Sequence, residues 1–478
     1  MTKVTDFFTA LMRKYLPDPF VFAIVLTLLT LVLAITVEGT GFLTVTDAWG
    51  DGFWGLLAFT AQMAVILAAG YVVASAPLTD RGLNWICDKV STPRAAVVVA
   101  TLVGSVGSYL NWGFGLVIGG IVAKKLAYRI RGVHYPMIIA AAYSGFTFYG
   151  LGLSATIPLT IATPGHTLEN QIGVIPLADT IFHPVILITA LVTIIVLPIV
   201  NMFLHPRPGQ PVTEIDREEF RGEMEPDRPL QTPVSGAGQP VGDGHGARSA
   251  TTERATATPV TAVEEDDSNT IASRLNNSRV LGLLIAAFGF VYIVRFLIRG
   301  ESVDLDFVNF VLLFLGILLL GSPANYVAKL SEGIKTVTGI ILQFPFYAGI
   351  LAIMTASGLV LTISDFFVGF SSAQTLPFWG YISSFVINFF APSGGGHWVL
   401  QGPFMMSAAA EVGADPAATA VSVQLGNAWN DLIQPFWILP ALALSRLKLK
   451  DIMGYTVIDM VVVGVIYGVA ILIWGQIA

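Results

Sequence analysis

A proline followed by three glycines interrupts an apolar stretch in the second half of the chain. The segment 388–403 reads NFFAPSGGGHWVLQGP. Proline has no N–H to donate, and a glycine costs about 1 kcal/mol relative to alanine within a helix, so this motif cannot continue a helix. The flanking apolar runs, 378–390 and 398–410, are each about half the length that crosses a bilayer. We therefore expect two half-helices that enter and leave the membrane on the same side, joined by an unwound tip.

Such a tip has the chemistry to bind a small anion. Backbone N–H groups at a helix N-terminus carry partial positive charge. Unpaired backbone at membrane depth is tolerated only where protein or water satisfies it. The alternative is a glycine kink that only lets two helices pack closely. The residues at this tip are Ser393, Gly394, Gly395 and Gly396, followed by His397 and Gln401.

The composition is that of a polytopic membrane protein. Of 478 residues, 54% are hydrophobic and 12% are charged, and the mean hydropathy is +0.72. The net charge of −7 argues against a nucleic-acid partner. The single cysteine, Cys87, excludes an internal disulfide and a cysteine metal cage. The segment 20–37 lacks a cleavage site, so we expect a first transmembrane helix there rather than a signal peptide.

A similar pattern occurs in the first half of the chain. The apolar run 95–127 is broken by glycines and by Asn111, which predicts a first hairpin with its tip at 108–115. Broken helices are expected at 145–152 and 426–434. One shift of 281 residues relates the two halves, and it places Gln62, Gly113, Gly115, Gly145 and Leu151 on Gln343, Gly394, Gly396, Gly426 and Leu432.

This duplication predicts an all-α protein with two repeats of inverted topology. The first repeat is expected over 1–203 with its hairpin at about 95–127, and the second over 301–478 with its hairpin at about 377–410. A connecting transmembrane helix at 278–300 makes the number of intervening crossings odd, which inverts the second repeat. The total is about nine transmembrane helices plus the two re-entrant hairpins. Inverted repeats with broken helices near the midplane are typical of secondary transporters.

Residues 204–277 have the composition of a disordered cytoplasmic linker, rich in Pro, Gly, Thr and charged residues. A brief surface helix at 216–228 is the alternative to an unstructured tether. The distribution of basic residues predicts the N-terminus inside and the C-terminus outside. In that orientation only Arg295 and Arg299, of 25 Lys and Arg, lie on or near the outer side.

Two tips that meet near the midplane would bring polar groups together. No lysine or arginine is available at this depth, and each unpaired buried charge is costly, so a ligand with one negative charge is favoured over two or three. The expected substrate-binding residues are Asn111, Gly113, Gly115, Ser393, Gly394, Gly395, Gly396, His397, Gln401, Asn427 and Asn430.

Asp431, Thr147 and Tyr149 are the candidates for binding a coupling cation or proton. Asp431 is the one acid expected well inside the membrane, where acids are usually functional; alternatively, it caps the second half of its helix. His397 could titrate or be a fixed donor to substrate. Gln401, Gln62 and Gln343 either line the path or bond across helices. No cofactor is expected, and Na⁺ near the hairpin tips is the one metal ion left open.

Three stretches resemble the short-chain fatty acid transporter family, of the acetoacetate and butyrate permease type. They are FAPSGGG at 390–396 with Trp398 and the following QGP, NWGFGL at 111–116, and GNAWN at 426–430. The resemblance covers both halves but not the 204–277 insert, which is longer than expected for the family. Members tend to have Gln where this chain has His397, so the substrate or the coupling could differ. The family is similar to a wider group of two-hairpin ion transporters.

The resemblance implies uptake of short monocarboxylates driven by an H⁺ or Na⁺ gradient, across the plasma membrane of a prokaryotic cell. Some relatives in the wider group move a transport domain in an elevator fashion, and a homodimer is left open. The rivals are a dicarboxylate or other organic-anion carrier and a passive channel. A membrane-embedded hydrolase or acyltransferase would use Ser393 and His397, but no motif supplies an oriented triad. The protein is therefore expected not to be an enzyme.

Overall fold

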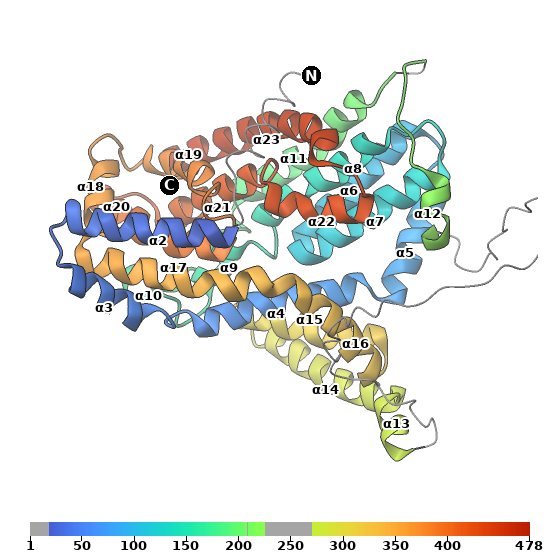
Figure 1. Cartoon of the computed structure of the whole chain (residues 1–478), viewed down its shortest axis with the longest axis horizontal. Helices are drawn as coiled ribbons and strands as arrows, with labels where there is room; N and C mark the ends of the chain where they lie inside the picture. Colours follow the sequence, from blue (N-terminus) through green and yellow to red (C-terminus); the bar gives the residue numbers. More distant parts are fainter. Residues whose placement is uncertain (1–18, 208, 225–269) are drawn as a thin grey trace, which may run out of the picture.

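The computed structural model describes residues 19–207, 209–224 and 270–478, and these form helices and loops without any strand (Figure 1). By length and composition, seven helices in these ranges could cross a membrane. Five shorter apolar helices, α2 among them, accompany these seven. The all-α membrane architecture is thus confirmed, whereas the expected nine crossings plus two hairpins stay a prediction.

The first half of the chain contains eleven α-helices and two 3-10 helices within the described residues. Their bounds are α2 Pro19–Thr36, α3 Phe42–Gly52, α4 Leu57–Ala74, α5 Pro77–Asp88, α6 Pro93–Leu110, α7 Trp112–Arg129, α8 Tyr135–Ser144, η1 Gly145–Leu151, α9 Thr156–Ala162, α10 Glu169–Ile172, η2 Leu177–Asp179, α11 Pro184–Leu204 and α12 Arg217–Met224.

The second half begins with a short helix before its first long apolar one. Its elements are α13 Ile271–Asn276, α14 Arg279–Ile298, α15 Leu305–Leu320, α16 Pro323–Ile334, η3 Lys335–Val337, α17 Thr338–Ser357, α18 Leu359–Val368, α19 Leu376–Ile387, α20 Gly394–Val412, α21 Pro416–Asn430, α22 Pro435–Ser445 and α23 Leu449–Ile477.

A single residue, Asn111, separates α6 from α7. Its side chain accepts a hydrogen bond from Phe114 N at 2.9 Å, which makes it the N-cap of α7. The two helices pack against each other closely enough that a Cβ on Gly115 would lie 2.3 Å from Ser108 N. Glycine at 115 therefore permits α6 and α7 to approach closely beside the break. The predicted interruption within 108–115 is confirmed.

The second interruption lies slightly earlier than predicted. The chain leaves α19 after Ile387 and re-enters a helix at Gly394, with Ser393 as the N-cap. The glycines thus form the first turn of α20 and are not an unwound loop. α20 is also longer than a half-helix, since it continues for 19 residues to Val412. Ser393 explains the early start, because its hydroxyl accepts from Gly396 N at 3.4 Å.

Both predicted broken helices are present. α8 changes into the 3-10 helix η1 at Gly145, and the chain resumes as α9 at Thr156. In the second half α21 runs to Asn430, and the chain is unwound from 431 to 434. Gly426, which we expected at the break, instead lies within α21. A Cβ there would come 2.3 Å from Tyr381 O, so this glycine serves the packing of α21 on α19.

The structure differs from the expected linker at both of its ends. Residues 209–224 include α12, whose Phe220 is 2% exposed, and Arg217 Nε donates to Tyr128 O at 3.0 Å. Tyr135 N donates to Thr213 O at 2.7 Å. The segment after Leu204 is therefore docked on the first half, and α13 lies at the other end. Residues 225–269 lie outside the described part of the chain.

The helices divide into two packed groups (Figure 1). One group contains α2, α3 and α4 with α14 to α17, and its α14–α16 part projects at one edge beside α4. The other contains the two interrupted pairs and the broken helices with α11 and α23. The groups touch where α4 packs on α7 and where α17 packs on α20. The two interruptions therefore lie near the contact between the groups.

Candidate functional site

A small cavity lies where the interruptions meet. Its volume is about 30 Å³, room for about two water molecules. The residues at or near the start of a helix that line it are Trp112 of α7, Thr156 of α9, Ser393, Gly394 and Gly395 at α20, and Phe436 and Trp437 of α22. Four helix N-termini therefore border one cavity, and their partial positive charges favour an anion there.

Two indole N–H groups at this cavity have no acceptor. Trp112 Nε1 and Trp437 Nε1 are both buried without a hydrogen-bond partner among the described residues. The two rings meet edge to face with centroids 5.4 Å apart. A buried donor left unpaired costs about 1–3 kcal/mol, so an acceptor that enters the cavity would recover that cost. None of the residues that line the cavity is a lysine or an arginine.

The rest of the cavity wall is apolar and aromatic. Met63, Phe344 and Ile340 line it from α4 and α17, and Phe146 lines it from η1. Phe146 stacks on Tyr149 at 4.9 Å. A ligand with one acceptor end and a short apolar tail matches this division between donors and hydrocarbon walls.

Behind the glycine turn, His397 lies in a buried polar network. Its Nε2 hydrogen-bonds to Gln401 Oε1, and its Nδ1 lies 3.1 Å from Asn427 Nδ2. Gln401 Nε2 in turn donates to Ser383 Oγ at 2.9 Å. Both imidazole nitrogens of His397 are thus engaged by neighbours, and His397 does not line the cavity. The network fixes the first turns of α20 against α19 and α21.

Asp431 joins this network to the cavity. Its Oδ1 accepts from Asn388 Nδ2 at 2.7 Å, and its Oδ2 accepts from Tyr149 Oη at 2.8 Å. The side chain is 1% exposed at the end of α21. Because Tyr149 also lines the cavity, a change in the charge of Asp431 acts directly on a wall residue.

Comparison with known proteins identifies the family of this chain. The family model of the short chain fatty acid transporter matches residues 1–237 and 251–474. A protein of Escherichia coli strain K12 is 35% identical over 97% of this chain and 98% of its own length. One of Haemophilus influenzae is also 35% identical, over 95% of this chain and 96% of its own. Both carry a provisional designation as short-chain fatty acid transporters.

The chain belongs to the short-chain fatty acid transporter family. It is accordingly a multi-pass membrane protein of a transporter family and not an enzyme. The match also corrects one expectation, because the family model extends well into 204–277 and leaves out only 238–250 between its two matched parts. Most of the supposed insert is therefore a family feature.

Two solved structures are similar in fold. The YdaH transporter of Alcanivorax borkumensis, described as having an unusual topology, superposes with a TM-score of 0.60 over 96% of this chain and 98% of its own. MtrF of Neisseria gonorrhoeae, described with a class of antimetabolite efflux pumps, gives 0.55 over 96% and 95%. Both are 13% identical to this chain, so the likeness concerns the fold alone.

The structure sorts the residues predicted to bind substrate into three groups. Ser393, Gly394 and Gly395 line the cavity, as does Tyr149 from the predicted coupling set. Others belong to the supporting network or to helix packing. These are His397, Gln401 and Asn427 in the network, Asn430, which donates to Phe385 O at 2.9 Å, Gly396 against Tyr347, Gly113 against Leu67, and Gly115 against Ser108.

Asn111 and Thr147 lie beside the cavity without lining it. The Asn111 Nδ2 atom is buried and has no partner among the described residues, while its Oδ1 caps α7. Thr147 Oγ1 donates to Ala428 O at 3.2 Å and lies 3.1 Å from Tyr467 Oη. Thr147 thus ties η1 to α21 and α23.

Sequence reasoning missed four residues that matter here. Trp112, Thr156 and Trp437 line the cavity, and Asn388 links Asp431 to the His397 network. Trp112 stands directly after Asn111, where the sequence predicts an interruption, so its place at a helix start was the available signal. Gln343, for which we left two roles open, lines the cavity and also accepts from Tyr347 Oη at 3.2 Å.

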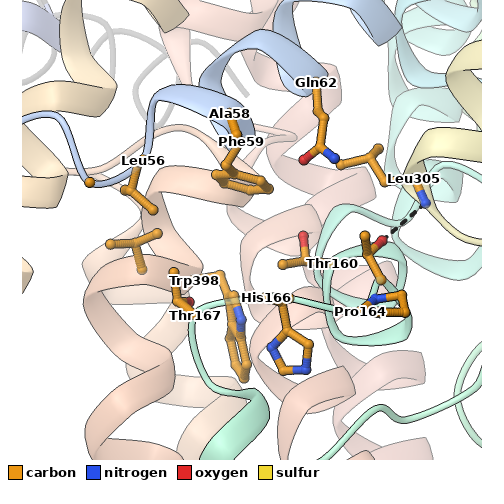
Figure 2. A pocket seen from close by; sticks show the side chains of 14 residues that line it. Leu56, Ala58, Phe59, Gln62, Thr160, Pro164, His166, Thr167, Leu305 and Trp398 are labelled. Atoms are coloured by element: carbon orange, nitrogen blue, oxygen red, sulfur yellow. Dashed lines mark hydrogen bonds between the residues drawn. The ribbon is translucent and has the colours of Figure 1, made fainter.

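A larger cavity of about 210 Å³ is lined by Trp398 and Val399, which follow the first turn of α20 (Figure 2). Figure 2 shows Gln62, Phe59, His166 and Trp398 around it. Phe59 stacks on Phe344 with centroids 5.7 Å apart, and Phe344 lines the smaller cavity. The stacked pair therefore stands between the two cavities.

Proposed function

We propose that this protein is a secondary active transporter for short-chain fatty acids, small monocarboxylates such as acetoacetate or butyrate, coupled to H⁺ or Na⁺. The observation that carries the proposal is the small cavity, where four helix N-termini and two unpaired indole N–H groups meet apolar walls without any basic side chain. A carboxylate is the acceptor that suits such donors, and a single charge is what they can neutralise.

In this mechanism the carboxylate binds between Trp112, Trp437 and the first turn of α20, with its tail against Met63 and Phe344. Since the cavity holds about two water molecules, a four-carbon acid enters only when the walls separate. The larger cavity beyond Phe59 is the proposed entrance, so the Phe59–Phe344 pair acts as its gate. Asp431, bonded to Tyr149, is the proposed site of the coupling ion.

The helix bounds support two repeats, here proposed as 1–203 and 301–478 and joined by α14. Adding 281 to the first residues of α3, α4 and α5 gives 323, 338 and 358, and α16, α17 and α18 begin at 323, 338 and 359. The same shift relates three pairs of residues that line one cavity: Met63 with Phe344, Trp112 with Ser393, and Thr156 with Trp437. A ligand site at the junction of inverted repeats is the arrangement that transporters use.

The proposed motion is of the elevator type. The interrupted helices and α11 with α23 would move as one body against α2 to α4 and α14 to α17, and the division into two packed groups supports this motion. The group of α2 to α4 and α14 to α17 would then provide the surface for a homodimer. The proposed orientation keeps the N-terminus and the 204–277 segment in the cytoplasm and the C-terminus outside.

The test is uptake of labelled C2 to C6 acids into proteoliposomes under an imposed H⁺ or Na⁺ gradient. We expect accumulation of butyrate above the external concentration and competition by acetoacetate but not by succinate. Competition by succinate at similar concentration would favour a dicarboxylate carrier instead. Equilibration without accumulation would identify a passive channel and contradict the proposal.

A further inference from the structure

A second buried acid lies away from the cavity and belongs to none of the predicted sites. We expected Asp431 to be the one acid deep in the membrane, but Asp459, in α23, is 0% exposed. It faces Asn201 of α11, and Asn201 faces Ser144 of α8 and Thr101 of α6. All four side chains are fully buried, with 0% of each exposed. Four helices thus contribute one polar side chain each.

The Asn201 amide can be placed in two orientations, which differ in the exchange of its nitrogen and its oxygen. In one, Nδ2 donates to Thr101 Oγ1 at 3.2 Å and Ser144 Oγ at 3.0 Å, and the amide oxygen faces the two carboxyl oxygens of Asp459 at 3.1 and 3.2 Å. In the other, the nitrogen donates to Asp459, and the oxygen accepts from both hydroxyls. Nitrogen and oxygen exchange places while every distance is kept.

Each orientation requires a different charge on Asp459. An amide oxygen facing a carboxyl group needs a proton between them, so the first orientation suits the neutral acid. In that state Thr101 and Ser144 donate to Val97 O and Ala141 O, both at 2.9 Å. The second orientation offers N–H to the carboxylate and suits the ionised acid. Each protonation state therefore has at least one hydrogen bond between Asp459 and Asn201.

No cation neutralises Asp459 from within the described chain. It forms none of the ion pairs found there, all of which involve other acids. An ionised carboxylate buried without a counter-charge is costly, so a proton is the natural neutralising species. The titratable or charged groups on α23 and the elements packed against it, end residues included, are Lys448, Lys450, Asp451, Tyr455 and Tyr467 of α23, His134, Tyr135 and Tyr143 of α8, His183 and His205 of α11, Tyr381 of α19, Asp415 and Asp431 of α21, and Arg446 of α22.

Two histidines lie between this cluster and the surface. His205 comes one turn after Asn201, and Tyr455 comes one turn before Asp459, about 6 Å along each axis. His134 N donates to His205 Nε2 at 3.1 Å, and the His134 ring lies 6.0 Å from that of Tyr455. His205 lines an open surface cavity of about 520 Å³. Burial lowers the pKa of both histidines, so they are uncharged at neutral pH, and a proton that binds to either one is readily passed on.

We propose that Asp459 is a proton-binding site of the transporter, loaded from the surface cavity at His205, with the Asn201 amide turning over as the proton binds or leaves. Ser144 is the last residue of α8, and η1 follows it directly with Phe146 and Tyr149 in the cavity wall. The proton on Asp459 therefore acts on the wall through η1. Coupling by this proton rests on the proposed transport function, whereas the proton site itself does not.

Infrared difference spectroscopy of the purified full-length protein tests the proton site without any substrate. The C=O stretch of a protonated carboxyl group should disappear as pH is raised, and Asp459→Asn should remove that band. Asp365→Asn, an exposed acid in α18, is the matched control and should retain it. A pH-dependent band of the same size in Asp459→Asn would overturn the proposal.

A second variant covers the case in which Asp459→Asn does not fold. Asn201→Ala removes the amide that serves both states, and we expect the pH midpoint of the band to shift by about one unit. An unchanged midpoint would exclude the exchange at Asn201. In proteoliposomes, Asp459→Asn should exchange butyrate across the membrane but lose accumulation driven by a pH gradient. Wild-type accumulation in that variant would refute coupling through Asp459, while a lack of uptake by the wild type would refute the transport function alone.

Discussion

Replacement of Gly395 by alanine should impair transport through one identifiable contact. A Cβ on Gly395 would lie 2.7 and 2.8 Å from two ring atoms of Phe59 and 3.3 Å from Phe344. Contacts below 3 Å force the ring to move, and overpacking of this kind costs about 1–3 kcal/mol. In the proposed cycle the gate must close again behind the substrate, so a cost of this size on the closed state lowers the uptake rate by roughly 5- to 150-fold.

The assay is the initial rate of labelled butyrate uptake into proteoliposomes, with thermal unfolding and size-exclusion profiles to establish that the variant folds. Gly82→Ala is the control, since a Cβ there meets nothing within 4 Å. Phe59→Leu should restore much of the lost rate in the Gly395→Ala background, because it removes the ring that the new methyl group meets. Wild-type uptake in Gly395→Ala, or a defect that Phe59→Leu leaves untouched, would refute the reasoning.

Three further perturbations test other parts of the account. Trp112→Phe removes one unpaired indole N–H but keeps an aromatic ring. The dissociation constant for butyrate, measured by calorimetry, should rise by roughly 5- to 150-fold for a lost hydrogen bond of about 1–3 kcal/mol. Unaltered affinity would show that the indole does not bind the substrate. Asp431→Asn should lower the accumulation ratio under an ion gradient more than it lowers exchange, and unchanged pH and Na⁺ dependence would remove Asp431 from coupling. Burial lowers the pKa of His205 in the folded protein. Below the ordinary value of about 6.5 the unfolded state therefore binds more protons than the folded state, and stability falls as the pH drops from 7.5 to 5.5. His205→Gln should reduce that fall in Tm, and an equal fall in both proteins would contradict the argument.

The sequence predicts interruptions better than it predicts what surrounds them. Asn111 and the run beginning at Ser393 were identified as breaks because proline, glycine and capping residues act locally. Local composition is a weaker guide at 77–88, where charged residues are typical of a loop and Pro77 in fact starts the helix α5. Likewise, the docking of Phe220 depends on residues far away in the sequence, which composition cannot reveal.

Side-chain direction is the part of the site that sequence could not supply. His397 follows the glycines directly, yet it points to Gln401 and Asn427 because α19 and α21 pack on that face of α20. Asp459 was overlooked because it stands in a long apolar helix, and its partner Asn201 is more than 250 residues earlier. Such pairs are determined by helix packing between the two halves and leave no trace in either segment alone.

The most direct test of the central claim is a structure of the protein with bound 4-bromobutyrate, whose bromine is located by anomalous scattering. The account predicts the bromine between Met63 and Phe344, in a small cavity that has opened, with the carboxylate at Trp112, Trp437 and the first turn of α20. Bromine found only in the larger cavity beside Trp398, or a carboxylate held by a lysine or arginine, would contradict it.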